Sequence, residues 1–241
     1  LLATSEYRTA RSLLTENVRI SARDALEGGV AVASVFFKSV EDAATMLSKE
    51  PSLQNALADP QAADRVLAIF QAYVESHSDV DNAFLGTRDK GFYVYPPPPG
   101  GSLPPGFDPT ARPWYSRTVE RGSITWTEPY MDHGTGKLVV TVAIPVYKNG
   151  DNQPIGVAGI DVALDHLASL ISTMKVGQAG YLVLMDQNGL VLAHPDPEVF
   201  GQDMGDSAVT QLVVSGTGET DYRSDGEEKF VAFTTLNRTG W

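Results

Sequence analysis

The chain has 241 residues, 42% of them hydrophobic and 20% charged, so its length fits one large globular domain or two small ones. Its formal net charge of −12 at pH 7 argues against binding to nucleic acid, or to anionic lipid through a polybasic face. The absence of cysteine excludes disulfides, thiol catalysis and zinc sites built on thiolates.

The first predicted element is a long helix over residues 1–50. No proline occurs between Ser5 and Pro51. Apolar residues recur in two groups in which the intervals are three or four, the period of an amphipathic helix, and Gly29 links the groups in the same register. The first group is Leu14, Val18, Ala22 and Ala25, and the second is Val32, Phe36, Val40, Ala43 and Leu47. Gly28 and Gly29 predict a bend, because glycine weakens a helix interior. A helix of this length suits a stalk or a dimer interface, with packing along one sheet as the equal alternative.

Residues 51–164 are expected to form an α+β module. After a helix capped by Asp59, "DNAFLGTRDKGFYVYP" predicts a β-hairpin that turns at residues 89–91. Further along, "SITWTEPYMD", "KLVVTVAIPVYK" and "PIGVAGIDVAL" predict three strands of an antiparallel meander.

A proline-rich loop and a short helix are predicted between the hairpin and the meander. The helix lies in "FDPTARPWYSRTVERG", with Asp108 as its cap and Gly122 at its end. Pro113 falls just past the first turn, where it predicts a kink or a split into two helices.

A connecting helix over residues 165–176 and a smaller module over residues 177–241 complete the chain. The smaller module begins with "GYLVLMDQNGLVLAHPD", a predicted hairpin with Asn188 and Gly189 in its turn. A short helix and a second hairpin, turning at residues 225–226, follow. The two halves share this outline, which indicates a duplicated α+β module.

Arg112, Trp114 and Tyr115 form the most informative cluster. A guanidinium pairs with a carboxylate through two parallel hydrogen bonds, and an indole N–H suits an acceptor oxygen. These residues therefore predict one wall of a pocket for a small carboxylate ligand. The alternatives are an ion pair between Arg112 and Asp108 one turn earlier, and core packing for Trp114.

The segments "FDPTARPWY", "WTEPYMD", "VVTVAIPV" and "GVAGIDVAL" resemble the double Cache sensor domains of bacterial chemoreceptors and sensor kinases. The resemblance covers nearly the whole chain. It implies an α+β fold with a long N-terminal helix and two PAS-like modules, each with a central antiparallel sheet. It also implies a location outside the cytoplasmic membrane, with residues 51–164 distal and residues 177–241 proximal to it. Homodimerisation through the N-terminal helix, and flanking membrane helices outside this sequence, are expected.

Within that family, a subset that binds amino acids carries a matching set of residues. The positions that match are Arg112, Trp114, Tyr115, Tyr130 and Asp161, and Asp132 lies where some members have another acidic contact. The resemblance thus implies that Arg112 binds the ligand carboxylate while Asp161 and Asp132 bind its α-ammonium. An acid at the end of a strand is otherwise often the cap of the next helix. Phe107 departs from the pattern, because the subset usually has tyrosine there.

The predicted function is therefore that of an extracytoplasmic sensor domain that binds a small ligand, with an α-amino acid as the first expectation. A kinase or cyclase input domain for a carboxylate or an amine is the alternative. A hydrolase is a more remote alternative, because the sequence has no nucleophile elbow and no zinc-protease signature. The four histidines are scattered, so we predict neither a transition-metal site nor a cofactor.

Overall fold

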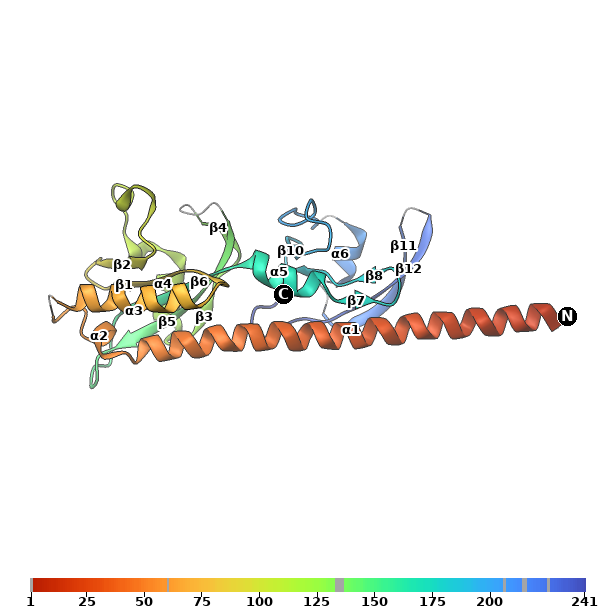
Figure 1. The fold of residues 1–241 in the computed structure, drawn as a ribbon, viewed down its shortest axis with the longest axis horizontal. Helices are drawn as coiled ribbons and strands as arrows, with labels where there is room; N and C mark the ends of the chain where they lie inside the picture. Colours follow the sequence, from red (N-terminus) through yellow and green to blue (C-terminus); the bar gives the residue numbers. More distant parts are fainter. Residues whose placement is uncertain (1, 60, 133–136, 206, 214–215, 225) are drawn as a thin grey trace. The chain divides into compact units, whose positions relative to one another are not determined.

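The computed structural model describes residues 2–241 except 60, 133–136, 206, 214–215 and 225. The chain divides into two compact units. The sheet unit comprises residues 36–164, and the hairpin unit comprises residues 1–35 together with residues 165–241 (Figure 1). The long N-terminal helix contributes residues to both units.

Helix α1 (Leu2–Ser48) confirms the predicted long helix. The part of α1 in the sheet unit buries Phe36, Val40 and Leu47 of the predicted stripe. Phe37 and Ala44 are buried as well, whereas the predicted Ala43 is half-buried. The earlier part differs from the prediction, because Leu14 and Val18 are 66% and 54% exposed. The helix continues through Gly28 and Gly29. A Cβ on Gly29 would lie 2.9 Å from Leu182 Cδ1, so this glycine permits close packing within the hairpin unit.

The core of the sheet unit is an antiparallel sheet of six strands. Five of them follow the order β2 (Phe92–Tyr95), β1 (Val80–Thr87), β6 (Pro154–Ala163), β5 (Leu138–Tyr147) and β3 (Thr125–Trp126). The sixth, β4 (Tyr130–Met131), also pairs with β5. The predicted β1–β2 hairpin and the meander around β5 are confirmed. Strand β6 lies between β5 and β1, and this long-range pairing joins the meander to the hairpin.

The two faces of this sheet have different neighbours. Side chains alternate between faces along a strand, so the paired residues Phe84, Gly159 and Ala143 share one face, named here the α4 face. On the opposite face, Phe37 of α1 meets Trp126 edge-on, with ring centroids 5.0 Å apart. Helices α2 (Pro51–Gln54) and α3 (Ala62–Ser76) precede the sheet, and α3 packs along β1 and β2 (Figure 1).

The proline in the predicted short helix splits it, as expected. Asp108 caps the 3₁₀ helix η2 (Pro109–Ala111) by accepting a hydrogen bond from the Thr110 backbone N–H. Arg112 is extended, with φ −81° and ψ 143°, and Pro113 then begins helix α4 (Pro113–Arg121). Gly122 ends α4 in the left-handed conformation, with φ 66°. A second 3₁₀ helix, η1 (Pro99–Gly101), lies in the proline-rich loop.

The hairpin unit pairs its strands two by two. After helix α5 (Leu164–Ser172), β7 (Lys175–Val176) pairs with β8 (Gly180–Tyr181), and β9 (Leu184–Met185) pairs with β10 (Val191–Ala193). Helix α6 (Ala208–Val213) leads to β11 (Gly218–Ser224) and its partner β12 (Glu227–Phe233). Gly189 has φ 93° in the predicted turn between β9 and β10. Residue 225 of the other predicted turn lies outside the described residues.

Candidate functional site

A row of polar side chains crosses the α4 face of the sheet. Asp161 of β6 lies directly opposite Asn82 of β1 on one side and Thr141 of β5 on the other. All three side chains therefore belong to the same face of the sheet. Residues on this face further along the same strands include Phe84, Gly159 and Ala143, which lie next to the row.

Asp161 is held in this row by hydroxyl donors. Thr141 Oγ1 donates to Asp161 Oδ1 over 2.5 Å, and the Tyr130 hydroxyl reaches the same oxygen over 3.2 Å. The Tyr130 and Thr141 hydroxyls also lie 2.9 Å apart. Asp161 is only 4% exposed, so these bonds replace much of the hydration of its carboxyl group. Tyr130 and Asp161, both predicted site residues, are thus brought into contact.

Burial also determines the charge of this carboxyl group. Desolvation raises the pKa of Asp161 from 3.8 to about 7, although the hydrogen bonds from Thr141, Asn82 and Tyr130 act in the opposite direction. The negative charge of Asp132 contributes to the rise. The pKa of the Tyr130 phenol is raised as well, first by burial and then by the charge of Asp161. A cation that reached this row would stabilise the ionised form of Asp161.

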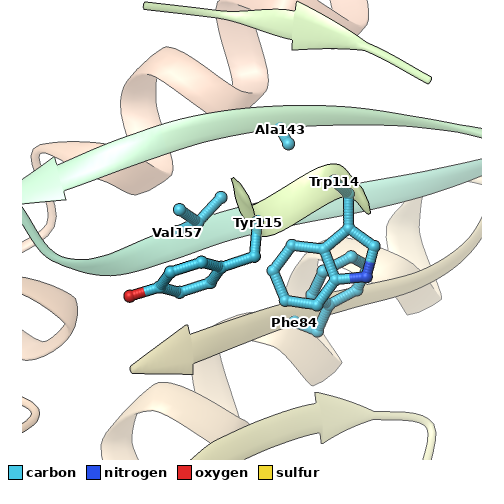
Figure 2. Close-up of a cluster of buried hydrophobic side chains, with 5 residues drawn as sticks. All are labelled: Phe84, Trp114, Tyr115, Ala143 and Val157. Atoms are coloured by element: carbon cyan, nitrogen blue, oxygen red, sulfur yellow. The ribbon is translucent and has the colours of Figure 1, made fainter. Parts of the chain in front are cut away.

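Helix α4 places Trp114 and Tyr115 on the same face of the sheet. Both residues are 7% exposed and form a buried cluster with Phe84, Ala143 and Val157 (Figure 2). The Trp114 ring lies 4.7 Å from the Phe84 ring, between centroids. It also fits against the bare backbone of Gly86, where a Cβ would lie 2.7 Å from the indole Cη2. The Trp114 ring is therefore packed in the core, which was the alternative to a role in ligand binding.

Arg112 lies half-buried at the start of α4, and the ion pair with Asp108 that was the alternative to a ligand-binding role is not formed. Asp108 instead binds Lys90, with Nζ and Oδ2 2.8 Å apart, and accepts hydrogen bonds from Thr110. The hydrogen bond from Lys90 is the main reason that the pKa of Asp108 is lowered to about 2. Within the described part of the chain, the Arg112 guanidinium has no ion pair. It therefore keeps its donors for another acceptor.

Asp132 lies near the Asp161 carboxyl group, and Phe107 lies near the aromatic cluster of Trp114. Asp132 is half-buried beside Tyr130, its backbone N–H donates to the Lys137 carbonyl over 2.9 Å, and its charge acts on Asp161. Phe107 joins the aromatic cluster, with its ring 4.9 Å from that of Phe92. Among the described residues, no hydrogen bond or ion pair connects Arg112 with Asp161. The geometry thus brings Tyr130, Asp132 and Asp161 together, and Trp114 with Tyr115.

Thr141 and Asn82 are site residues that the sequence analysis did not identify. Their signal is a polar residue at an inward position of a strand, Thr141 in "VVTVAIPV" and Asn82 in "DNAFLG". That signal becomes visible only when the register of three strands is known. The arrangement as a whole offers a buried acid at one place and an unpaired guanidinium at another, both in the sheet unit.

Comparison with known proteins gives a consistent picture. A family model described as "Cache domain" (dCache_1) matches residues 9–241. The methyl-accepting chemotaxis protein TlpB of Bacillus subtilis (strain 168) is 34% identical over 173 residues, which make up 71% of this chain and 25% of TlpB. This chain spans about a quarter to a third of the length of the curated relatives that it matches.

Solved structures with the same fold are ligand-binding domains of chemoreceptors. The domain of PctB from Pseudomonas aeruginosa PAO1, in complex with L-Arg, is 26% identical with a TM-score of 0.62, covering 95% of this chain and 89% of that one. The sensory domain of Tlp3 from Campylobacter jejuni, with isoleucine bound, is 21% identical with a TM-score of 0.77, covering 95% of this chain and 91% of that one.

None of the described helices combines the length and hydrophobicity needed to cross a membrane.

Proposed function

The chain belongs to the Cache domain family, and from that premise we propose that it is the extracytoplasmic sensor domain of a transmembrane chemoreceptor. Its relatives are named as methyl-accepting chemotaxis proteins, which supports a role in binding and signalling rather than catalysis. In this proposal residues 51–164 form the membrane-distal module and residues 177–241 the proximal one. The full-length receptor dimerises through α1 and has membrane helices on both sides of this domain.

We propose further that the ligand is an α-amino acid bound on the α4 face of the sheet unit. The observation that carries this proposal is that, within the described part of the sheet unit, the Arg112 guanidinium has no ion pair and the buried carboxyl group of Asp161 has hydrogen-bond donors but no cationic partner. A zwitterion supplies the carboxylate for the first and the ammonium for the second. The complexes of PctB with L-Arg and of Tlp3 with isoleucine support the same ligand class.

Each site residue has a definite part in this proposal. Arg112 binds the α-carboxylate through two parallel hydrogen bonds, and the Trp114 indole N–H donates to one of its oxygens. Asp161 and Asp132 receive the α-ammonium. Tyr115 and Tyr130 enclose the ligand with their rings and offer their hydroxyl groups. A small ligand paired at both charges is expected to bind with roughly micromolar affinity, about 8 kcal/mol.

The ligand acts as a signal because it binds two arrangements of the domain with different affinity. A difference of about 1–3 kcal/mol between these affinities is the usual size of such coupling. Ligand contacts in the sheet unit involve β1, β5, β6 and α4, and α1 packs against the other face of that sheet through Phe37 and Trp126. We propose that repacking of the sheet is transmitted to α1.

A thermal-shift screen tests the proposed function. The protein is heated with each of the twenty amino acids, with small organic acids and with biogenic amines, alongside Arg112→Ala and the control Arg117→Ala. A ligand that binds only the folded state raises the melting temperature. We expect at least one amino acid to stabilise the parent and Arg117→Ala but not Arg112→Ala. Arg117 is a fair control because it is an exposed arginine on the same helix. Stabilisation by amines alone, unaffected by Arg112→Ala, would overturn the proposal.

A further inference from the structure

Asn82 has an unexplained acceptor next to the proposed ammonium site. It lies opposite Asp161 in the sheet, and its side chain lowers the pKa of the Asp161 carboxyl group, as a nearby hydrogen-bond donor does. The ionised carboxylate only accepts hydrogen bonds, so with Asp161 in that form the Asn82 amide nitrogen is the atom that faces it. The amide oxygen Oδ1 is buried and has no hydrogen-bond partner among the described residues. A buried amide oxygen without a donor is uncommon in folded proteins and destabilising.

The local backbone keeps Asn82 in this position. The register between β1 and β6 shifts at Asp81, so that Val80 pairs with Val162 while Asn82 pairs with Asp161. Such a bulge places one extra residue in the strand and redirects its neighbours, and bulges are frequent next to functional sites. Asp81 itself binds the Lys137 ammonium, with Oδ1 and Nζ 2.8 Å apart. The Lys137 ammonium thus binds Asp81, and it forms no hydrogen bond with Asn82 Oδ1.

The hydrogen bonds of Asp161 show where a cation would enter. Its Oδ1 already accepts from both Thr141 and Tyr130, which uses the two lone pairs of that oxygen. The free capacity is therefore on Oδ2. Thr141 lies on one side of Asp161 and Asn82 on the other, so a donor that reaches Oδ2 has the Asn82 amide as its neighbour.

We propose that Asn82 Oδ1 accepts a hydrogen bond from a primary ammonium group bound at Asp161, and that Asn82 thereby selects primary amines over N-alkylated ones. This inference rests on the proposed function and adds a specificity-determining residue to the same site. A primary ammonium has three N–H donors, enough for Asp161, Asn82 and one further acceptor. A secondary ammonium has two, so one acceptor of the site stays unpaired and that ligand binds more weakly.

The test compares one ligand pair across three variants by titration calorimetry. The pair is the amino acid with the largest thermal shift in the screen of twenty and its Nα-methyl form. The variants are Asn82→Leu, which removes the acceptor, Asn82→Asp, which retains one, and the control Thr87→Val. Thr87 is a buried polar residue of the same strand whose side chain binds Asp89 and Gly91 instead of the site.

The parent and Thr87→Val are expected to bind the primary amine at least about tenfold more tightly than its N-methyl form. Asn82→Leu should weaken binding of the primary amine about tenfold and change that of the N-methyl form less than about threefold, which isolates the coupling between the two groups. Asn82→Asp should keep the preference for the primary amine over its N-methyl form. Equal losses for both ligands in Asn82→Leu, or an unchanged preference, would overturn this inference alone. If the parent binds none of the twenty amino acids, the proposed function fails, and this inference fails with it.

Discussion

Thr141 and Asp161 face each other across β5 and β6, and the Thr141 hydroxyl donates to the Asp161 carboxylate over 2.5 Å. The register of the central strands thus places a hydroxyl donor beside an acid that is 4% exposed. This bond and those from Tyr130 and Asn82 make burial of the acid tolerable, but they do not reverse the effect of desolvation on its pKa.

Replacing Asp161 with asparagine should stabilise the ligand-free protein at high pH. The pKa of Asp161 is about 7 in the folded state against 3.8 ordinarily, so between these values the folded state binds more protons than the unfolded state. The contribution of Asp161 to the free energy of unfolding therefore falls as pH rises through this window, by at most about 4 kcal/mol. Urea denaturation should show Asp161→Asn more stable than the parent at pH 8 and close to it at pH 4. Equal differences at both pH values would contradict this prediction.

Ligand affinity should fall as pH decreases below 7. An ammonium binds the ionised form of Asp161, so protonation of this group competes with binding. For a group with a pKa of about 7, the Kd at pH 6 should be about ten times that at pH 8. Titration calorimetry of the strongest amino acid at several pH values measures this. The groups that act on Asp161 are Asp132, Tyr130, Thr141 and Asn82, and an affinity that stays constant across this range would show that Asp161 is not the ammonium partner.

Thr141→Val should move the midpoint of the pH dependence of ligand affinity to higher pH. The valine has the same shape but no hydroxyl, so the carboxylate of Asp161 loses its shortest hydrogen bond and its ionised form becomes less favourable. We expect a midpoint of binding at higher pH than in the parent, together with a loss of about 1–3 kcal/mol in stability at pH 8. The calorimetric pH series checks the midpoint. A destabilised variant with an unchanged midpoint would limit Thr141 to a packing role.

Gly86→Ala should disturb the aromatic cluster under α4. A Cβ at this position would lie 2.7 Å from Trp114 Cη2 and 2.9 Å from Pro109 Cβ, so rings in a packed core would have to move. We expect a loss of about 1–3 kcal/mol in stability and a change in tryptophan fluorescence. The matched control is Ala83→Gly in the same strand. This substitution removes a methyl group from the face of the sheet opposite the α4 face. Unchanged fluorescence in Gly86→Ala would contradict the packing described for Trp114.

Arg19 should hold the hairpin β11–β12 to α1 within the hairpin unit. Its Nη2 binds both carboxylate oxygens of Asp221 at 2.9 and 2.6 Å, and its guanidinium lies 4.4 Å from the centroid of Phe230. Arg19→Ala should therefore speed hydrogen exchange in the hairpin by roughly three- to tenfold, corresponding to about 1 kcal/mol. The control Arg11→Ala removes a more exposed pair at 3.8 Å and should have no measurable effect. Similar exchange in both variants would refute a special role for Arg19.

Local patterns predicted much of the fold correctly. The absence of proline indicated the long helix α1, and Pro113 indicated the split between η2 and α4. These features depend on backbone chemistry within a few residues, which the sequence displays directly. The exposure of Leu14 was not predicted, because the period of a stripe indicates an apolar face but not whether anything covers it.

The candidate site was only partly accessible from the sequence. Tyr130 and Asp161 were identified, whereas Thr141 and Asn82 were not, because their roles depend on which strands are neighbours. The insertion of β6 between β5 and β1 joins residues far apart in the chain, and alternation within one strand cannot reveal it. The alternative role for Arg112, an ion pair with Asp108, could not be judged from the sequence for a related reason, since Lys90 reaches Asp108 from the β1–β2 hairpin.

The central claim is that Arg112 and Asp161 bind the two ends of one zwitterion. Titration calorimetry of the parent and Arg112→Ala, with the strongest amino acid and its decarboxylated amine, tests it most directly. We predict that the parent binds the amino acid with about micromolar Kd and the amine at least tenfold more weakly, and that Arg112→Ala reduces the affinity for the amino acid to that for the amine. Equal binding of the two ligands by the parent, unchanged in Arg112→Ala, would contradict the claim.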